Sequence, residues 1–283
     1  MNMPLTINGL SEIAQDYNAL ACDAWGVIHN GRALLPGAAE AMIAFRETCG
    51  PVVILTNAPK PSPIIPPQLD RLGLSRQAWD GIVTSGDATR AEVLKRLPAP
   101  AWRIGPDFDD AFFDGLGAEF VPPSEAGFIV CTGLNDGFEE VPEMYHDDLR
   151  AGVDRGLEMV CANPDITVNW GGRMMWCAGA LAQIYEAFGG KVVYGGKPHA
   201  PIYDLVRAET EKHRAGNTDP LRILAVGDGI NTDIMGANRA GLDALLVTGE
   251  GGLNEGASHR DEIALKLRDA GVHAHAIIEG LRW

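Results

Sequence analysis

Basic residues are scarce in this sequence, and their scarcity excludes one class of partner. Lys and Arg number 23 against 38 Asp and Glu, which gives a formal net charge of −15. Proteins bind nucleic acid or an anionic membrane through clustered Lys and Arg, so we expect neither partner. A small phosphate ester remains open as a ligand, because one lysine, backbone amides and a metal ion can create a local positive field.

Paired cysteines, clustered histidines and long hydrophobic runs are also missing. The five cysteines include no C-x-x-C pair, and no Cys or His residues group at the spacing of a zinc site. Their odd number indicates free thiols in a reducing compartment. The first fifteen residues lack the basic and apolar regions of a signal peptide, and no apolar run reaches the roughly 18 residues of a membrane span. We therefore expect a cytoplasmic protein.

What the sequence does contain is a regular alternation of apolar strand patterns and helix patterns. The uninterrupted apolar run at residues 51–55 predicts a strand that is covered on both faces, and residues 221–226 predict a further buried strand. From about residue 87 the alternation restarts with shorter units, as in an inserted second domain. The predicted fold class is α/β, with a Rossmann-like doubly wound parallel sheet at residues 1–86 and 190–283 and an inserted α/β domain at residues 87–189.

Local patterns make narrower predictions. Residues 59–67 contain five prolines, which predicts a rigid loop followed by a short helix at 68–74. The Asn30-Gly31 pair predicts the tight turn of a small hairpin. In the inserted part, we expect a helix at residues 107–116 and a strand at 118–121.

Polar side chains stand just after four predicted strands, in a chain whose strands are otherwise apolar. Because the carboxyl ends of parallel strands lie along one edge of a sheet, these side chains can converge there. Carboxylates without neighbouring His or Cys suit a hard cation, most plainly Mg²⁺, and a lysine with a threonine suits a phosphoryl group. These residues are Asp23, Thr56 with Asn57, Lys197, and Asp228 with the nearby Asp233.

The same residues carry a resemblance to the haloacid dehalogenase superfamily. The chain contains four motifs in that family's order and spacing, with an insert between the second and third that marks a C2-type cap domain. Further short pieces resemble class IIA, the NagD-like phosphatases. The four motifs are Asp23-x-x-Gly26-Val27, Leu55-Thr56-Asn57, Gly196-Lys197-Pro198 and Gly227-Asp228-x-x-x-Thr232-Asp233, and the further pieces include Leu35-Pro36-Gly37-Ala38, Asn163-Pro164-Asp165 and Gly241-Leu242-Asp243.

This resemblance implies catalytic roles for the matched residues. Asp23 would be the nucleophile and would form an aspartyl-phosphate. Thr56 would bind the transferring phosphoryl group with Asn57 beside it, and Lys197 would hold the nucleophile and the phosphate together. The expected function is Mg²⁺-dependent hydrolysis of a small-metabolite phosphate, such as a sugar phosphate or a nucleotide.

The resemblance also implies a metal site and a lid. Asp23, Asp228 and the main-chain carbonyl of Trp25 would ligate Mg²⁺, and Asp233 would support the ion directly or through water. The inserted domain would close over the core, choose the leaving group and help to form a homodimer. Within it, the turn that contains Asn163 and Asp165 either contacts the substrate or only shapes the chain; both readings stay open.

Trp25 departs from the family pattern. The phosphatases usually carry a second Asp at this position, which protonates the leaving group, and general acid–base help of this kind is worth about 10²–10⁴-fold in rate. The leaving group could need no proton, or another group could supply it, His29 being the nearest candidate. We expect His29 to be an exposed turn residue instead. Alternatively, the protein is a weak enzyme or only binds phosphate ligands.

A dehalogenase is the rival enzyme, because dehalogenases of the superfamily also place an aromatic residue at this position. Those enzymes need no metal, whereas Asp228 and Asp233 are both present here. The C2-type cap also argues against a dehalogenase. The sequence therefore favours the metal-dependent phosphatase.

Overall fold

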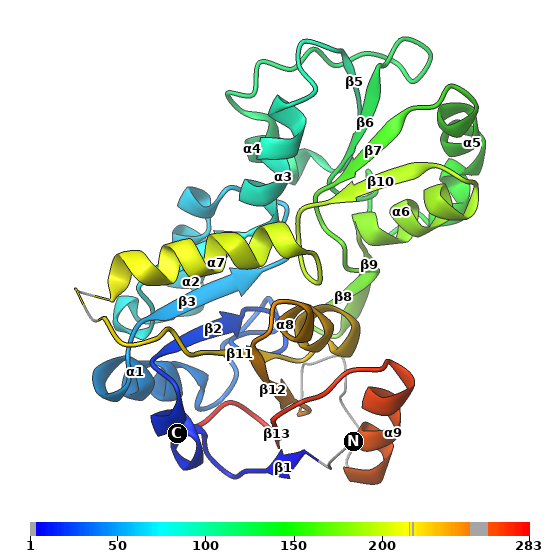
Figure 1. Cartoon of the computed structure of the whole chain (residues 1–283). Helices are drawn as coiled ribbons and strands as arrows, with labels where there is room; N and C mark the ends of the chain where they lie inside the picture. Colours follow the sequence, from blue (N-terminus) through cyan, green and yellow to red (C-terminus); the bar gives the residue numbers. More distant parts are fainter. Residues whose placement is uncertain (1–3, 215, 217, 250–259) are drawn as a thin grey trace.

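The computed structural model describes residues 4–214, 216, 218–249 and 260–283, which fold into two α/β parts (Figure 1). Within these residues the larger part is built on a seven-stranded sheet and the smaller part on a four-stranded sheet. A two-stranded hairpin lies between them in the view of Figure 1. The predicted fold class, a doubly wound parallel sheet with an inserted α/β part, is confirmed.

The larger sheet changes its direction of winding beside β2. From β2 the chain adds β3 and β4 on one side, and it later returns to place β11 and β12 on the other side, always in parallel. Such a switch point leaves a crevice outside the strand ends, where ligands bind in open α/β sheets. In spatial order the strands are β1 (Leu5–Thr6), β13 (Ala276–Ile278), β12 (Asp243–Val247), β11 (Ile223–Gly227), β2 (Ala19–Asp23), β3 (Val52–Thr56) and β4 (Gly81–Thr84).

Successive side chains of β2 enter different hydrophobic cores, because a strand points them alternately to its two faces. Leu20 packs in the core that helix α1 covers, and Ala21 packs in the core that helix α7 covers. This double coverage explains the uninterrupted apolar strands of the sequence. The helical elements of this part are η1 (Leu10–Glu12), η2 (Ala14–Asp16), α1 (Ala38–Thr48), η3 (Ser62–Ile64), α2 (Pro66–Leu72), η4 (Arg76–Ala78), α7 (Ala200–His213), η7 (Ile230–Ile234), α8 (Met235–Arg239) and α9 (Arg260–Asp269), while α3 (Ser85–Leu94) leads into the smaller part.

The smaller sheet is also parallel, in the order β10-β7-β6-β5. The predicted boundary at residue 190 assigns the strand at residues 191–194 to the larger part. This boundary is wrong, because the strand pairs with β7 of the smaller sheet. The edge that a strand joins is decided by tertiary pairing, which a sequence pattern does not show. The elements are β5 (Ala101–Ile104), η5 (Asp107–Asp109), α4 (Asp110–Phe113), β6 (Phe128–Cys131), η6 (Pro142–Tyr145), α5 (His146–Asp154), β7 (Glu158–Cys161), β8 (Thr167–Trp170), β9 (Arg173–Trp176), α6 (Ala178–Ala187) and β10 (Lys191–Tyr194).

Three local predictions met different outcomes. The turn at Asn30-Gly31 is confirmed, with Gly31 at a φ of 85° between the bridged residues His29 and Leu34. Helix α2 begins at Pro66, inside the expected loop, because proline is tolerated in a first helical turn, where its missing N–H is not needed. The expected strand at 118–121 is wrong: it makes only an isolated bridge at Phe120.

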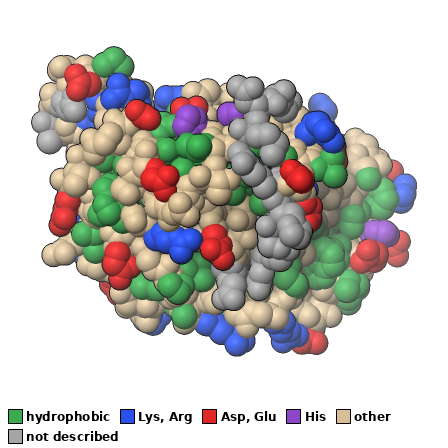
Figure 2. Space-filling model, turned by 90° about the horizontal axis from the view of Figure 1, so that it is seen from below, with side chains coloured by type: hydrophobic (Ala, Val, Ile, Leu, Met, Phe, Trp, Pro, Cys, Tyr) green, Lys and Arg blue, Asp and Glu red, His purple; other side chains and the backbone are tan. Residues whose placement is uncertain are grey.

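The surface and the helix lengths fit the composition. No helix in the described ranges is both long and apolar enough to cross a membrane. On the face shown in Figure 2, acidic and basic side chains are interspersed with apolar ones. The net negative charge is thus spread over this face rather than gathered in one patch.

Candidate active site

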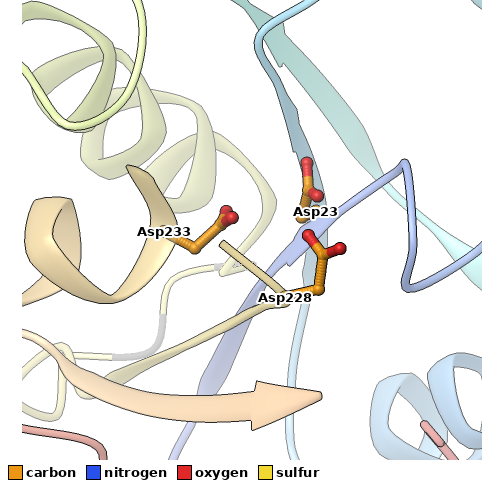
Figure 3. A group of neighbouring side chains, drawn as sticks. All are labelled: Asp23, Asp228 and Asp233. Atoms are coloured by element: carbon orange, nitrogen blue, oxygen red, sulfur yellow. The ribbon is translucent and has the colours of Figure 1, made fainter. Parts of the chain in front are cut away.

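Three aspartates converge at the switch point of the larger sheet (Figure 3). Asp23 is the last residue of β2 and Asp228 follows β11, and these neighbouring parallel strands bring the two side chains to the same edge. Asp233 approaches from the irregular helical turn η7. Each of the three offers a carboxylate oxygen, and these oxygens lie within 4.8 Å of one another. The sequence-based expectation that these residues meet is therefore confirmed in geometry.

Asp233 is fixed by its own turn rather than acting as a simple helix cap. Its Oδ2 accepts hydrogen bonds from the backbone N–H of Gly229 at 3.1 Å and from the Thr232 hydroxyl at 3.2 Å. Gly227 lets the carboxylate approach the strand end, because a Cβ there would lie 2.2 Å from the Asp233 carboxyl carbon. The opposite oxygen, Oδ1, is left for the centre of the site.

Lys197 joins two of the three carboxylates. Its Nζ donates hydrogen bonds to Oδ1 of Asp23 and to Oδ1 of Asp233, both at 2.6 Å, and the side chain is 2% exposed. Burial alone would lower the pKa of Lys197, but the two carboxylates raise it well above its usual range. Burial raises the pKa of Asp23, and the Lys197 ammonium opposes that rise. Three carboxylates thus face one ammonium, which favours a further cation.

Asn57 connects this centre to the smaller part. Its Oδ1 accepts a hydrogen bond from the Lys197 backbone N–H at 2.7 Å, and its Nδ2 donates to Oδ1 of Asp165 at 2.9 Å. Asp165 in turn follows an Asx-type turn, in which its N–H donates to Oδ1 of Asn163 at 3.1 Å. Asn163 therefore shapes the turn, and Asp165 is linked to the site through Asn57, while contact of this turn with the substrate stays a prediction.

Thr56 presents a hydroxyl to the same space. Its Oγ1 accepts a hydrogen bond from the Ala58 N–H at 3.1 Å, which leaves the hydroxyl proton to be donated. The residue is 3% exposed and lines the pocket together with Asp23 and Lys197. A donor here, beside an ammonium, suits the oxygens of a phosphoryl group.

A pocket of about 1100 Å³, its open mouth included, lies between the ends of the two parallel sheets. Its floor contains the polar residues described above, namely Asp23, Thr56, Asn57, Lys197, Asp228 and Asp233. Four aromatic side chains from both parts of the chain contribute to its walls. They are Trp25 from the larger part and Phe108, Trp170 and Trp176 from the smaller part.

Trp25 is held firmly in this wall. Its ring centroid lies 5.0 Å from that of His29 and 5.5 Å from that of Trp170, both in edge-on contacts. Gly31 provides the room, because a Cβ there would lie 2.4 Å from the indole. The indole therefore lies in the wall of the pocket that also contains Asp23.

His29 does not replace that acid. We expected an exposed turn residue, but the side chain is 6% exposed, and it is not among the residues that line the pocket. Burial lowers its pKa to about 4, so the imidazole is neutral at pH 7. Its Nδ1 accepts a hydrogen bond from the Gly31 N–H at 3.1 Å, which gives it a structural role beneath Trp25.

Several polar pocket residues were not singled out from the sequence, among them Lys60, Asp109 and Thr132. Asp109 and Thr132 follow strands β5 and β6 of the smaller sheet. The rule that drew attention to Asp23 and Asp228, namely a polar residue after a parallel strand, applies to Thr132, but the strands of the smaller sheet are too short for such a residue to stand out in the sequence.

The donor set fits Mg²⁺. All the clustered side-chain ligands are carboxylate oxygens, which Mg²⁺ prefers over nitrogen or sulfur. Asp23, Asp228 and Asp233 would hold the ion. The main-chain carbonyl of Trp25 remains a predicted ligand.

Known proteins share these sequence and structural features. A family model described as haloacid dehalogenase-like hydrolase matches residues 20–118, and one described as HAD-hydrolase-like matches residues 194–270. The ribonucleotide monophosphatase NagD of Escherichia coli (strain K12) is 30% identical over 239 residues, covering 80% of this chain and 85% of NagD.

Solved structures agree. A haloacid dehalogenase-like family hydrolase from Brucella suis 1330 is 38% identical, with a TM-score of 0.87, and the match covers 97% of this chain and 99% of that one. The glycerol phosphate phosphatase of Mycobacterium tuberculosis, solved in complex with magnesium, shares the fold at 24% identity and a TM-score of 0.63, over 86% and 71% of the two chains. Ordered motifs, fold and relatives lead to one conclusion: the chain belongs to the haloacid dehalogenase-like hydrolases.

Proposed function

We propose that this hydrolase cleaves small-metabolite phosphate monoesters with Mg²⁺, through an aspartyl-phosphate at Asp23, and that the smaller α/β part, which includes β10, acts as its cap. The observation that carries the proposal is the Lys197 ammonium, held 2.6 Å from both Asp23 and Asp233 beside Asp228. NagD, which is named a ribonucleotide monophosphatase, supports this reaction class. A bound Mg²⁺ would supply positive charge at the transferring phosphoryl group.

The residues of this chain would divide the work as follows. An oxygen of Asp23 attacks phosphorus, and the bond from phosphorus to the leaving oxygen breaks. Lys197 and the Thr56 hydroxyl stabilise the charge on the remaining phosphoryl oxygens. Water then attacks the phosphorus of the aspartyl-phosphate, which releases phosphate and restores Asp23. Asn57 positions Lys197 through the hydrogen bond to its backbone N–H.

Trp25 bears on the substrate class. An indole has no titratable proton in the useful range, so it does not protonate the leaving oxygen. Substrates whose leaving groups depart without a proton, such as aryl phosphates, would therefore react faster than alkyl phosphates.

The test uses p-nitrophenyl phosphate, whose leaving group needs little protonation. We expect turnover that requires Mg²⁺ and that falls by at least about 10³-fold in Asp23→Asn, because the nucleophile is lost. The absence of Mg²⁺-dependent turnover, or equal turnover in the variant, would contradict the proposal. Halide release from a 2-haloacid without metal would indicate the dehalogenase instead.

A phosphate-binding protein without catalysis is the second candidate, and the indole of Trp25 beside Asp23 favours it. Calorimetric titration with inorganic phosphate and Mg²⁺ separates the two. Phosphate binding together with no turnover of any ester would support the binding protein.

A further inference from the structure

Two residues of the cap part that line the pocket each contain a buried polar atom without a hydrogen-bond partner. Asp109 and Thr132 are each 2% exposed. In the described part of the chain, neither Oδ1 of Asp109 nor Oγ1 of Thr132 has a hydrogen-bond partner of acceptable distance and angle. Buried polar groups are nearly always paired, because leaving one unpaired costs about 1–3 kcal/mol. Two unpaired atoms on one pocket wall therefore point to a ligand.

The backbone places these two side chains together. Asp109 ends the turn η5 after β5, and Thr132 directly follows the neighbouring parallel strand β6. The Thr132 hydroxyl lies near the Asp109 carboxyl and lowers its pKa, but the contact does not have the distance and angle of a hydrogen bond. Both residues line the same pocket as Asp23. The pocket thus has a phosphoryl-binding floor in the larger part and a second polar group in the cap.

Nearby basic residues do not neutralise Asp109 by direct pairing. The Arg103 guanidinium donates to Oδ1 of Asp110, and the Lys60 ammonium lies 5.3 Å from the centre of the Phe108 ring. Burial raises the pKa of Asp109 to about 7, while Lys60, Thr132 and Arg103 lower it and Asp110 raises it. A carboxylate in this setting gains most from a donor that a ligand brings.

Aromatic side chains line the pocket between its floor at Asp23 and the pair of Asp109 and Thr132. Trp170 makes edge-on contacts with Trp25 at 5.5 Å and with Phe108 at 6.5 Å between ring centroids. Aromatic walls of this kind can bury the planar, largely apolar middle of a ligand, while polar side chains of the pocket bind its polar ends.

We propose that Asp109 and Thr132 form a subsite in the cap that binds a hydrogen-bond donor, a hydroxyl or a protonated amine, on the leaving group of the substrate. This inference rests on the proposed phosphatase function. The subsite fixes the end of the leaving group that is remote from phosphorus. It therefore selects among phosphate esters without taking part in bond cleavage.

Three aryl phosphates of similar shape test the subsite: 4-ethylphenyl, 4-(hydroxymethyl)phenyl and 4-(aminomethyl)phenyl phosphate. In the wild type, the two donor-bearing esters should exceed the ethyl ester in kcat/KM by about 10- to 100-fold, the range of a hydrogen bond to a charged group. Asp109→Asn should remove most of this preference, measured as the ratio of kcat/KM for the donor-bearing esters to kcat/KM for the ethyl ester. Thr132→Val should reduce the preference in the same sense.

Asp107→Asn is the matched control, because Asp107 stands in the same turn with an exposed side chain. It should leave all three kcat/KM values unchanged. An Asp109→Asn variant that lowers the three esters equally, or none of them, would overturn the subsite. Circular dichroism and thermal melting establish that each variant is folded.

A binding experiment separates the subsite from the proposed function. Calorimetry in the Asp23→Asn background with Mg²⁺ compares 4-(aminomethyl)phenyl phosphate with 4-ethylphenyl phosphate. The amine should bind more tightly than the ethyl ester, and this difference should disappear in the Asp23→Asn, Asp109→Asn double variant. That result supports the subsite even if no ester is turned over. Equal binding of the two esters would overturn it.

Discussion

The Nζ atom of Lys197 lies 2.6 Å from Oδ1 of Asp23, although 174 positions separate the two residues in the sequence. The contact is almost sealed from solvent, since the two side chains are 3% and 8% exposed. It places a positive charge beside the proposed nucleophile before any substrate arrives.

Lys197→Met should abolish most activity and weaken the fold. Removing the ammonium leaves Asp23 and Asp233 facing each other unneutralised, and breaking a buried ion pair costs about 3–5 kcal/mol. We expect the free energy of unfolding, measured by urea denaturation without metal, to fall by roughly this amount, and kcat/KM for p-nitrophenyl phosphate to fall by at least about 10²-fold. Lys191→Met, at an exposed position, is the control. Unchanged kcat/KM in Lys197→Met would refute the assigned role.

Mg²⁺ should stabilise the folded protein through the three aspartates. A ligand at 100 times its Kd adds about 2.7 kcal/mol to the stability of the state that binds it. Tm should therefore rise with Mg²⁺ in the wild type and much less in Asp228→Asn. Asp269→Asn, on an exposed part of α9, should respond like the wild type. An equal rise in Asp228→Asn would show that the ion binds elsewhere.

Trp25→Asp should restore a proton donor beside the leaving oxygen. We expect kcat/KM for alkyl phosphates such as glycerol phosphate to rise by about 10²-fold or more relative to p-nitrophenyl phosphate, because only the alkoxide needs the proton. Trp25→Asn lacks the acidic proton and should give no such selective gain. Loss of the indole contacts with His29 and Trp170 should also lower Tm in both variants. An equal change for both substrates would mean that another group supplies the proton.

Asp109 should make the stability of the protein depend on pH. Its pKa is raised by burial from 3.8 to about 7, so the folded state binds more protons than the unfolded state between these values. Stability is therefore lost as the pH rises from about 4 to 7, by up to roughly 4 kcal/mol, and then levels off. Asp109→Asn removes the carboxyl that causes this pH dependence. The difference in Tm between the variant and the wild type should therefore increase from pH 5 to pH 7 and stay constant above pH 7. The control Asp107→Asn should show no such trend, and a pH-independent difference for Asp109→Asn would contradict the buried, unpaired carboxyl.

The sequence alone predicts the core of the site because two constraints act together there. Strands covered on both faces must be apolar, so Asp23 and Asp228 stand out where these strands end. Thr56 follows from the same reasoning, because the parallel neighbours β2, β3 and β11 end along one edge. Lys197 follows β10 of the smaller sheet instead, so the order of the motifs, and not a shared sheet edge, predicts its place.

The cap was harder to predict from the sequence. Its strands are short, so the residues that follow them, Asp109 and Thr132, do not stand out against the surrounding loops. The hairpin β8–β9 was not predicted, since Trp170 and Trp176 lie on partly exposed strands around a glycine turn. The burial of His29 depends on Trp25 lying over it, a tertiary contact that the turn sequence does not encode.

The central claim, covalent transfer to Asp23, is tested most directly by trapping the intermediate. The protein is acid-quenched during turnover of p-nitrophenyl phosphate with Mg²⁺, reduced with borohydride, digested and analysed by mass spectrometry. The account predicts that Asp23 is converted to homoserine in proportion to the trapped acyl phosphate, and that Asp23→Asn shows no conversion. Sustained turnover with Asp23 unmodified, or modification at another carboxylate, would contradict it.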